Sequence, residues 1–342
     1  MTLAIVTYHY RSFSNLPCGD GFGSNFLAFY NIFCESLGAL ALGFFFMISG
    51  FLLYHGAADC RAILKKIKKR LYSLGVPYLL WNCIVMCYVY LKDRTIPFSS
   101  VTDLLKRFTV LPFDGPLWYI TVLLLLLIPA PLVIQLKKHP KVSVVLLVGL
   151  FAFAFCVSEL NLFPRLSALT YFWWLERFIR YLPAYFLGAF AAMHISRFIL
   201  EEQYPKRTVC ITCTVLYIAS LLFLFRFDGT GVGTWLILRL QPILFWFATS
   251  SNLFKGNPPF PLQISFFIYA MHQQILMREI DAFLLPRLAQ YVFAPYQIVL
   301  LRLLGVVLVY VAALIITLLC RYLLHPKFFA ALSGNRIPSA EK

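Results

Sequence analysis

The chain has 342 residues, of which 61% are hydrophobic and 13% are charged. Soluble domains are about half apolar and a quarter charged, so this composition excludes an ordinary soluble enzyme and a disordered chain. A membrane-spanning helix needs roughly 20 apolar residues. Ten such helices would use about 200 residues and leave about 140 for loops, so the composition predicts a polytopic helical membrane protein.

The formal net charge is +16, from 30 Lys and Arg against 14 Asp and Glu. In a soluble protein this excess would indicate nucleic-acid binding. In a membrane protein it fits the cytoplasmic loops, which collect Lys and Arg, so we expect no nucleic-acid partner. Cys210 and Cys213 have a CxxC spacing but no second pair to complete a zinc site, and we predict no metal.

A series of apolar runs, bounded by charged residues, proline or glycine, follows along the chain. The first run is too short to cross a hydrocarbon core, and it lacks the basic start and cleavage site of a signal peptide. We therefore predict an all-α fold, a polytopic transmembrane helical bundle of about ten helices with a truncated first helix. The runs are 1–13, 37–54, 71–91, 116–135, 142–158, 171–193, 208–225, 234–251, 262–284 and 298–321.

The Lys and Arg residues gather in alternate loops, after the second, fourth, sixth and eighth runs, and in the tail. Short loops rich in Lys and Arg face the cytoplasm. We therefore expect a multi-pass protein of the plasma or inner membrane, in contact with membrane lipids, with both termini in the cytoplasm. Residues 1–325 would form the transmembrane domain, and 326–342 a short cytoplasmic tail.

Six short segments in a fixed order carry a resemblance to a known family. They are IVTYHYRSF (5–13), GFFFMISGFLLY (43–54), KKIKKRLYSLGVPYLLW (65–81), GPLWYI (115–120), YLPAYFLGAF (181–190) and SFFIYAMHQ (265–273). Together they resemble the membrane-bound acyltransferase family 3, whose members move acyl groups, often acetyl, onto sugars and other extracytoplasmic acceptors.

The chain departs from the family pattern at three places. The family has a basic residue eleven positions before the first-helix His, but only eight residues precede His9. Its Arg-x-x-Arg appears here as lysines within 65–69, followed by Arg70; lysine keeps the charge but loses the bidentate fork. Thr121-Val122 stands where related sequences often have Arg-Asp.

His9 is the candidate general base. It lies in an apolar helix between Tyr8 and Tyr10, and an imidazole can accept a proton from a hydroxyl near neutral pH. Ionisable residues inside a membrane are functional candidates, and the resemblance implies catalysis. The alternative is a structural hydrogen bond between helices. Glu35 and Asp20 are the candidate carboxylates that would orient the ring, and either could instead be a solvated loop residue.

The basic segment 61–70 has two readings that can hold together. It fixes topology and contacts anionic lipid. The resemblance also implies that it binds the phosphates of a coenzyme A donor, most plausibly acetyl-CoA, and Lys66, Lys69 and Arg70 are the best candidates. Acyl-CoA would then be the co-substrate.

Several charges fall in the outer half of the predicted membrane, where they must pair or line a wet cavity. They predict a polar cavity for a carbohydrate or glycolipid acceptor, with snorkelling to the interface as the alternative. Trp118 could stack on a sugar ring, although an aromatic interface belt also explains it. His272 is expected to make an interhelical hydrogen bond. The candidate acceptor-binding residues are Arg177, Arg180, Arg239, Arg278 and Trp118.

The sequence thus predicts an integral membrane acyltransferase of the O-acetyltransferase type. It would transfer an acyl group directly from cytoplasmic acyl-CoA to a hydroxyl of an extracytoplasmic or lipid-linked sugar, because no Ser or Cys lies in a motif that would activate it as a nucleophile. The alternative is a transporter or flippase of a glycan or lipid-linked sugar that needs no base. Against it, the chain shows no repeated halves.

Overall fold

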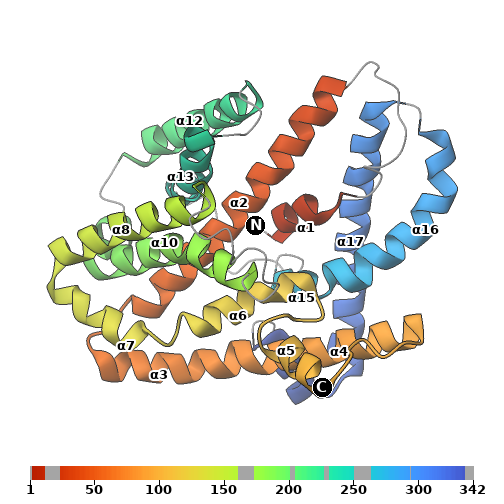
Figure 1. The fold of residues 1–342 in the computed structure, drawn as a ribbon, viewed down its shortest axis with the longest axis horizontal. Helices are drawn as coiled ribbons and strands as arrows, with labels where there is room; N and C mark the ends of the chain where they lie inside the picture. Colours follow the sequence, from red (N-terminus) through yellow and green to blue (C-terminus); the bar gives the residue numbers. More distant parts are fainter. Residues whose placement is uncertain are drawn as a thin grey trace. The chain divides into compact units, whose positions relative to one another are not determined.

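A computed structural model describes residues 2–11, 24–160, 173–200, 205–226, 231–249, 263–292 and 294–335. The elements within these ranges are helices, and no strand occurs among them. The predicted all-α class is therefore confirmed. Figure 1 traces the helices in chain order.

Among the described residues, five helices are long and apolar enough to cross a membrane, so the chain is a multi-pass membrane protein. A sixth candidate is the bent pair Gly115–Leu125 and Ala130–Lys138, which turns by 50°. The predicted runs at 171–193 and 234–251 correspond to α10 (Trp173–His194) and α13 (Gly231–Thr249). The total of ten stays a prediction. The five helices are α2 (Ser24–Tyr54), the continuous Cys60–Asp93, α8 (Pro140–Ser158), α12 (Lys206–Arg226) and α17 (Pro295–Leu323).

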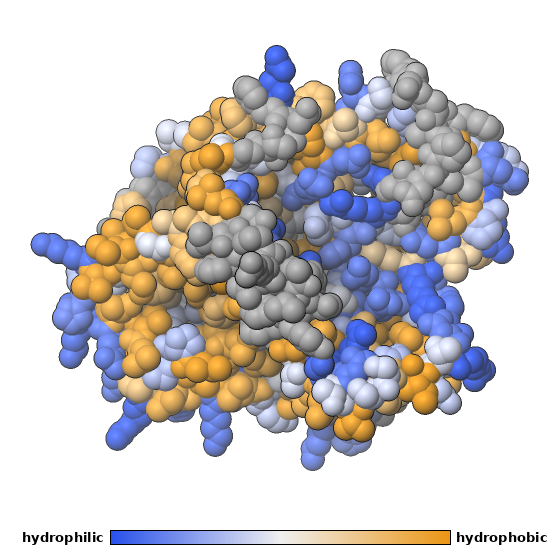
Figure 2. Space-filling model, in the orientation of Figure 1, coloured by the Kyte–Doolittle hydropathy of each residue, from blue (hydrophilic) through white to orange (hydrophobic). Residues whose placement is uncertain are grey.

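Large apolar side chains remain exposed along these helices. Val145 on α8 is 72% exposed, Leu222 on α12 is 57% and Val307 on α17 is 56%. Figure 2 shows hydrophobic side chains over much of the visible surface. Exposed apolar surface of this extent marks an interaction surface, and in a multi-pass protein the lipid tails cover it.

By internal contacts, the chain divides into two compact units. Unit 1 comprises residues 1–38, 70–121 and 257–342. Unit 2 comprises residues 39–69 and 122–256. Each unit is described by itself below.

In unit 1, α1 (Thr2–His9) packs against α17 and α15 (Ser265–Met271). The predicted tail begins with a helix, α18 (Pro326–Ser333), which packs against α4 (Val76–Asp93). The Trp81 indole N–H donates to the Leu332 carbonyl at 3.1 Å, and the Phe267 and Phe329 rings stack at 5.5 Å. The first part of this segment is therefore packed structure.

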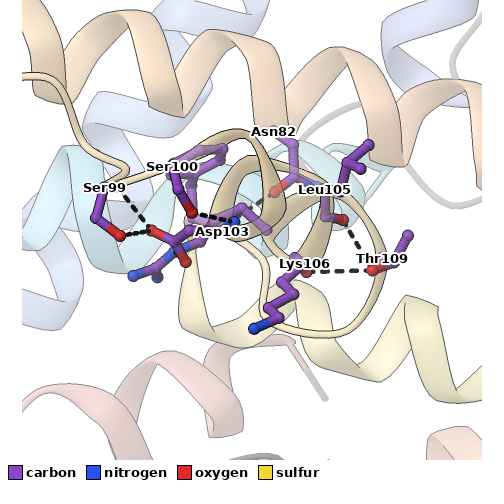
Figure 3. Close-up of polar contacts among 9 residues, drawn as sticks. Asn82, Ser99, Ser100, Asp103, Leu105, Lys106 and Thr109 are labelled. Atoms are coloured by element: carbon purple, nitrogen blue, oxygen red, sulfur yellow. Dashed lines mark hydrogen bonds and ion pairs between the residues drawn. The ribbon is translucent and has the colours of Figure 1, made fainter.

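The predicted loop 92–115 contains a short amphipathic helix, α5 (Val101–Thr109). Its start is capped: the Ser100 hydroxyl accepts from the Asp103 backbone N–H at 3.1 Å, and the Asp103 carboxylate accepts from the Ser99 N–H at 3.1 Å (Figure 3). Such reciprocal caps satisfy the free N–H groups of the first turn. Nearby, the buried Asn82 side chain accepts from the Phe113 N–H at 3.0 Å and fixes the end of the loop.

In unit 2, the second half of α2 crosses α10 at very close range. A Cβ added to Gly50 would overlap the Tyr185 carbonyl, and one added to Gly188 would overlap the Met47 carbonyl. Small residues permit this approach of two helix backbones in a membrane. Gly50 therefore serves helix packing.

Two π-helical segments interrupt the helices in the described part of unit 1. One is η1 (Leu71–Gly75), which directly follows the basic helix α3 (Cys60–Arg70). The other is η6 (His272–Met277), between α15 and α16 (Arg278–Leu288). π-Helical turns are rare and are frequently found at functional sites.

Candidate functional site

The end of α1 is held in place by the residues on either side of His9. The Tyr8 ring fills the space over Gly38, and the fully buried Tyr10 ring lies against Gly305 so closely that a Cβ there would overlap it. The Tyr10 hydroxyl donates to the Asp281 carboxylate at 2.9 Å. His9 itself is half-buried. Its backbone is therefore fixed while its ring keeps access to its surroundings.

His272 is the first residue of η6 and is completely buried. Its Nδ1 lies 2.9 Å from the Tyr269 carbonyl and 3.2 Å from the Ile268 carbonyl. A carbonyl only accepts, so Nδ1 must donate and carry the proton. In the neutral ring, Nε2 then holds a lone pair. This atom is buried and has no hydrogen-bond partner in the part of the chain that the structure describes.

The structure brings His9 and His272 together within unit 1. Their ring centroids are 5.3 Å apart, with the planes inclined by 46°. The pair therefore combines a half-buried imidazole with a buried one whose tautomer is fixed. Chemically, such a pair can take a proton from a hydroxyl and stabilise the imidazolium that results.

The segment before α6 (Trp118–Leu125) supports η6 from another side. The Tyr269 hydroxyl donates to the Pro116 carbonyl, and the Gln273 side chain lies against Gly115. Asp114 is fully buried, and neither carboxylate oxygen has a well-formed hydrogen bond to a residue that the structure describes. Burial raises the pKa of Asp114 well above its usual range, and the Gln274 backbone N–H facing the carboxylate offsets only part of this effect.

A family model describing an acyltransferase domain matches residues 2–324, and so covers both histidines and nearly the whole chain. The chain belongs to acyltransferase family 3. No curated protein and no solved structure matches it. The resemblance seen in the sequence is thereby confirmed, and the chain is a membrane acyltransferase.

Of the two carboxylates predicted to orient His9 in the acyltransferase, only Glu35 is described; Asp20 lies outside the described residues. The Glu35 carboxylate accepts from the Arg11 guanidinium at 3.2 Å, and both side chains are more than half exposed. In this geometry Glu35 helps to hold the end of α1. Its role toward the His9 ring stays a prediction.

The predicted donor cations of the acyltransferase lie on α3 and differ in their surroundings. The Lys66 ammonium donates to the Leu52 carbonyl at 3.4 Å and also to the His55 carbonyl, so it binds the C-terminal end of α2. That end carries the negative pole of the helix dipole. Lys69 is exposed, and Arg70 is half-buried.

The predicted acceptor residues fall into both units, and we take each unit separately. In unit 1, Arg278 bonds the Asp93 carboxylate, and Trp118 is only 4% exposed. In unit 2, Arg177 and Arg180 are half-buried on α10, and Arg180 pairs with Glu176. Arg239 is near Arg180 in the same unit, and the two charges interact electrostatically.

The sequence did not single out Asp114, and it assigned His272 only a structural bond. The signal for His272 was the Tyr-x-x-His pattern in an otherwise apolar run. The signal for Asp114 was an acidic residue immediately before Gly-Pro at the start of an apolar run. Neither pattern tells which distant residue the side chain will meet.

Proposed function

We propose that this membrane acyltransferase moves an acyl group, which we take to be acetyl, from cytoplasmic acyl-CoA to a hydroxyl of an extracytoplasmic or lipid-linked sugar. The observation that carries the proposal is the ring contact of His9 with His272, whose Nε2 is an unused acceptor. A base is required for acyl transfer to a hydroxyl, whereas the alternative function, transport of a glycan, has no need of one.

In the proposed reaction, His9 takes the proton of the acceptor hydroxyl as its oxygen attacks the thioester carbonyl. A new C–O bond forms, and the tetrahedral intermediate then breaks the C–S bond. The imidazolium of His9 returns the proton to the departing coenzyme A sulfur. Acyl ester and free thiol are the products, and no acyl-enzyme is needed.

His272 acts in this scheme as a positioning residue. Its lone pair on Nε2 is available to accept a hydrogen bond from the His9 imidazolium, which stabilises the charge that develops during proton transfer. An orienting partner of this kind is what a carboxylate supplies in a catalytic triad. The neutral imidazole can fill that role here because its own tautomer is fixed by the Tyr269 carbonyl.

The donor and the acceptor would use different cations. Lys69 and Arg70 would bind the phosphates of coenzyme A, and Lys66 would add its charge while it bonds the end of α2. The acceptor would be a carbohydrate or glycolipid, bound by the candidate residues named from the sequence. Both termini would lie in the cytoplasm, and the protein in the plasma or inner membrane.

The test is transfer of radiolabel from acetyl-CoA to cell-envelope material by membranes that contain the full chain. We expect His9→Ala to reduce labelling by at least a hundredfold, the usual share of a general base. The control is His139→Ala, which removes an exposed imidazole at the start of α8. Undiminished labelling by His9→Ala would refute the assignment of the base.

The same assay separates a positioning role of His272 from a purely structural one. His272→Gln can still accept a hydrogen bond but cannot become charged. We expect it to retain partial activity and to move the acid limb of the pH–rate profile. A loss of activity with an unchanged profile would contradict the positioning role, because a structural defect lowers the rate at all pH values alike.

A further inference from the structure

Two buried donors on α13 have no acceptor. The indole N–H of Trp235 and the Nε–H of Arg239 lie one helical turn apart, and neither has a hydrogen-bond partner within the ranges that the structure describes. Both groups can only donate. Leaving buried donors unpaired is costly, so this position requires an acceptor that the described chain does not supply.

The surroundings of Arg239 supply rings in place of a counter-ion. Its guanidinium carbon lies 5.3 Å from the Tyr181 ring and 5.5 Å from the Trp235 ring. Glu159 and Arg180 act on it only electrostatically, and no carboxylate among the described residues comes within ion-pair distance. Ring faces attract the cation, and the Tyr181 side chain also forms a hydrogen bond with the guanidinium. The charge is thus partly stabilised, while the Nε–H has no acceptor among the described residues.

A second cation in unit 2 has the same deficiency. Arg180 bonds the Glu176 carboxylate through a terminal nitrogen, and its Nε is also buried without a partner in the described ranges. The three open groups, on Arg180, Trp235 and Arg239, are all N–H donors. A set of donors with a positive local charge is the chemistry that recognises an oxyanion.

Arg239 also lines a pocket whose other walls are apolar. These walls come from α2, α8, α10 and α13, all within unit 2. Apolar walls disfavour a small, strongly hydrated anion, since it would lose its water without replacement. They favour a ligand with an apolar part next to its charged group. The other lining residues are Ala39, Gly43, Met47, Phe151, Ala184, Leu187, Leu238, Pro242 and Ile243.

We propose that this pocket binds the oxyanion head group of an amphiphile, a carboxylate or a phosphate ester, at the Arg239 guanidinium that lines it. The indole N–H of Trp235, which lies outside the pocket lining but whose ring is 5.5 Å from the guanidinium carbon, would be the second donor. The apolar part of the ligand lies against the walls formed by α2 and α13. The proposal gives a chemical class to the acceptor-binding role predicted for Arg239. It concerns binding alone, so it can fail or succeed independently of acyl transfer.

The experiment measures ligand-induced thermal stabilisation of the purified full chain in an uncharged detergent. The probes are octyl phosphate, octanoate, octanol and inorganic phosphate. We expect saturable stabilisation by octyl phosphate and octanoate, and none by octanol. Inorganic phosphate at the same concentration should have little effect. Equal stabilisation by inorganic phosphate would overturn the inference that the ligand needs an apolar part. Stabilisation by octanol would overturn the inference that it needs a negative charge.

Variants then locate the site. Arg239→Gln should weaken the binding of octyl phosphate about tenfold to hundredfold, the cost of one charge-assisted bond. Trp235→Phe keeps the ring and removes only the N–H, and it should weaken binding several-fold even if Arg239→Gln fails to fold. The control is Arg207→Gln, at an exposed position of α12. Unchanged binding by Trp235→Phe and by any folded Arg239 variant would overturn the proposal.

Discussion

Replacing Asp114 with Asn should stabilise the protein at neutral pH. Asp114 lies just before the apolar segment that starts at Gly115 and is fully buried, and within the described ranges neither of its oxygens has a well-formed hydrogen bond. Burial disfavours the charged form, so the pKa of this carboxyl is raised in the folded protein. In the unfolded chain the same group ionises at its ordinary value of about 3.8.

The sign and size follow from this difference. A raised pKa in the folded state means that stability is present at low pH and is lost as the pH rises through the folded-state value. Above the ordinary pKa of about 3.8, keeping a carboxyl neutral costs about 1.4 kcal/mol more for each pH unit. An Asn side chain has nearly the same shape and avoids this cost.

The assay compares thermal unfolding of the wild type and Asp114→Asn in detergent between pH 5 and 8, at one heating rate. We expect the advantage of the variant to grow by about 1.4 kcal/mol per pH unit for as long as the wild-type group stays protonated. The control is Asp103→Asn, which alters the hydrogen-bonded cap of α5 and should give no stabilisation. If Asp114→Asn were less stable than the wild type at pH 7, the group would be an engaged carboxylate and the reasoning would be wrong.

Three further changes have defined outcomes. Gly305→Ala should push the Tyr10 ring away and lower the rate of acyl transfer more than tenfold. Overpacking costs about 1–3 kcal/mol, and the displaced ring holds the end of α1. Activity equal to wild type would contradict this. Gly50→Ala should prevent close contact with the Tyr185 carbonyl and lower the yield of folded protein, as judged by size-exclusion chromatography in detergent. Lys69→Gln should raise the KM for acetyl-CoA several-fold with little change in kcat, and an unchanged KM would leave this lysine only a role in topology.

The apolar runs of the sequence predicted the long helices well. The run 142–158 corresponds to α8, 208–225 to α12 and 298–321 to α17, each within three residues at both ends. Such runs are easily recognised in the sequence because a membrane helix is apolar all round, and its length follows from the bilayer thickness. The charged ends and the prolines then mark where each helix begins.

The interruptions inside the helices could not be predicted from the apolar runs. The run 262–284 was expected as one helix, but it consists of α15, the π-helix η6 and α16. The segment 326–342 was predicted as a short cytoplasmic tail, and the sequence did not indicate that it begins with α18, packed through Phe329 against Phe267. A π-helical turn is set by contacts with distant residues, such as that of Gln273 with Gly115, and local hydrophobicity does not encode them.

In the candidate site, too, the sequence predicted single residues but not their contacts with distant residues. The sequence identified His9 by its isolation in an apolar run, but its contact with His272 depends on how α1 packs against α15 and η6. Glu35 was a reasonable orienting partner by position alone. In the structure its carboxylate pairs with Arg11, two residues after the end of α1, and its role toward the His9 ring stays a prediction. A carboxylate that can pair with a guanidinium at the surface avoids the desolvation cost of approaching a half-buried imidazole.

The buried groups that carry the two proposals have opposite polarity, and this separates the proposed chemistry from the proposed binding. In unit 1, His272 offers a lone pair, which can take a hydrogen bond or a proton. In unit 2, Arg239 and Trp235 offer only N–H groups, which can bind an anion but cannot accept a proton at neutral pH. Arg239→Gln should therefore leave the pH–rate profile of acyl transfer in place, whatever its effect on KM. If Arg239→Gln instead shifted that profile as much as His272→Gln does, both groups would affect the same titrating group. The separation of chemistry from binding would then be wrong.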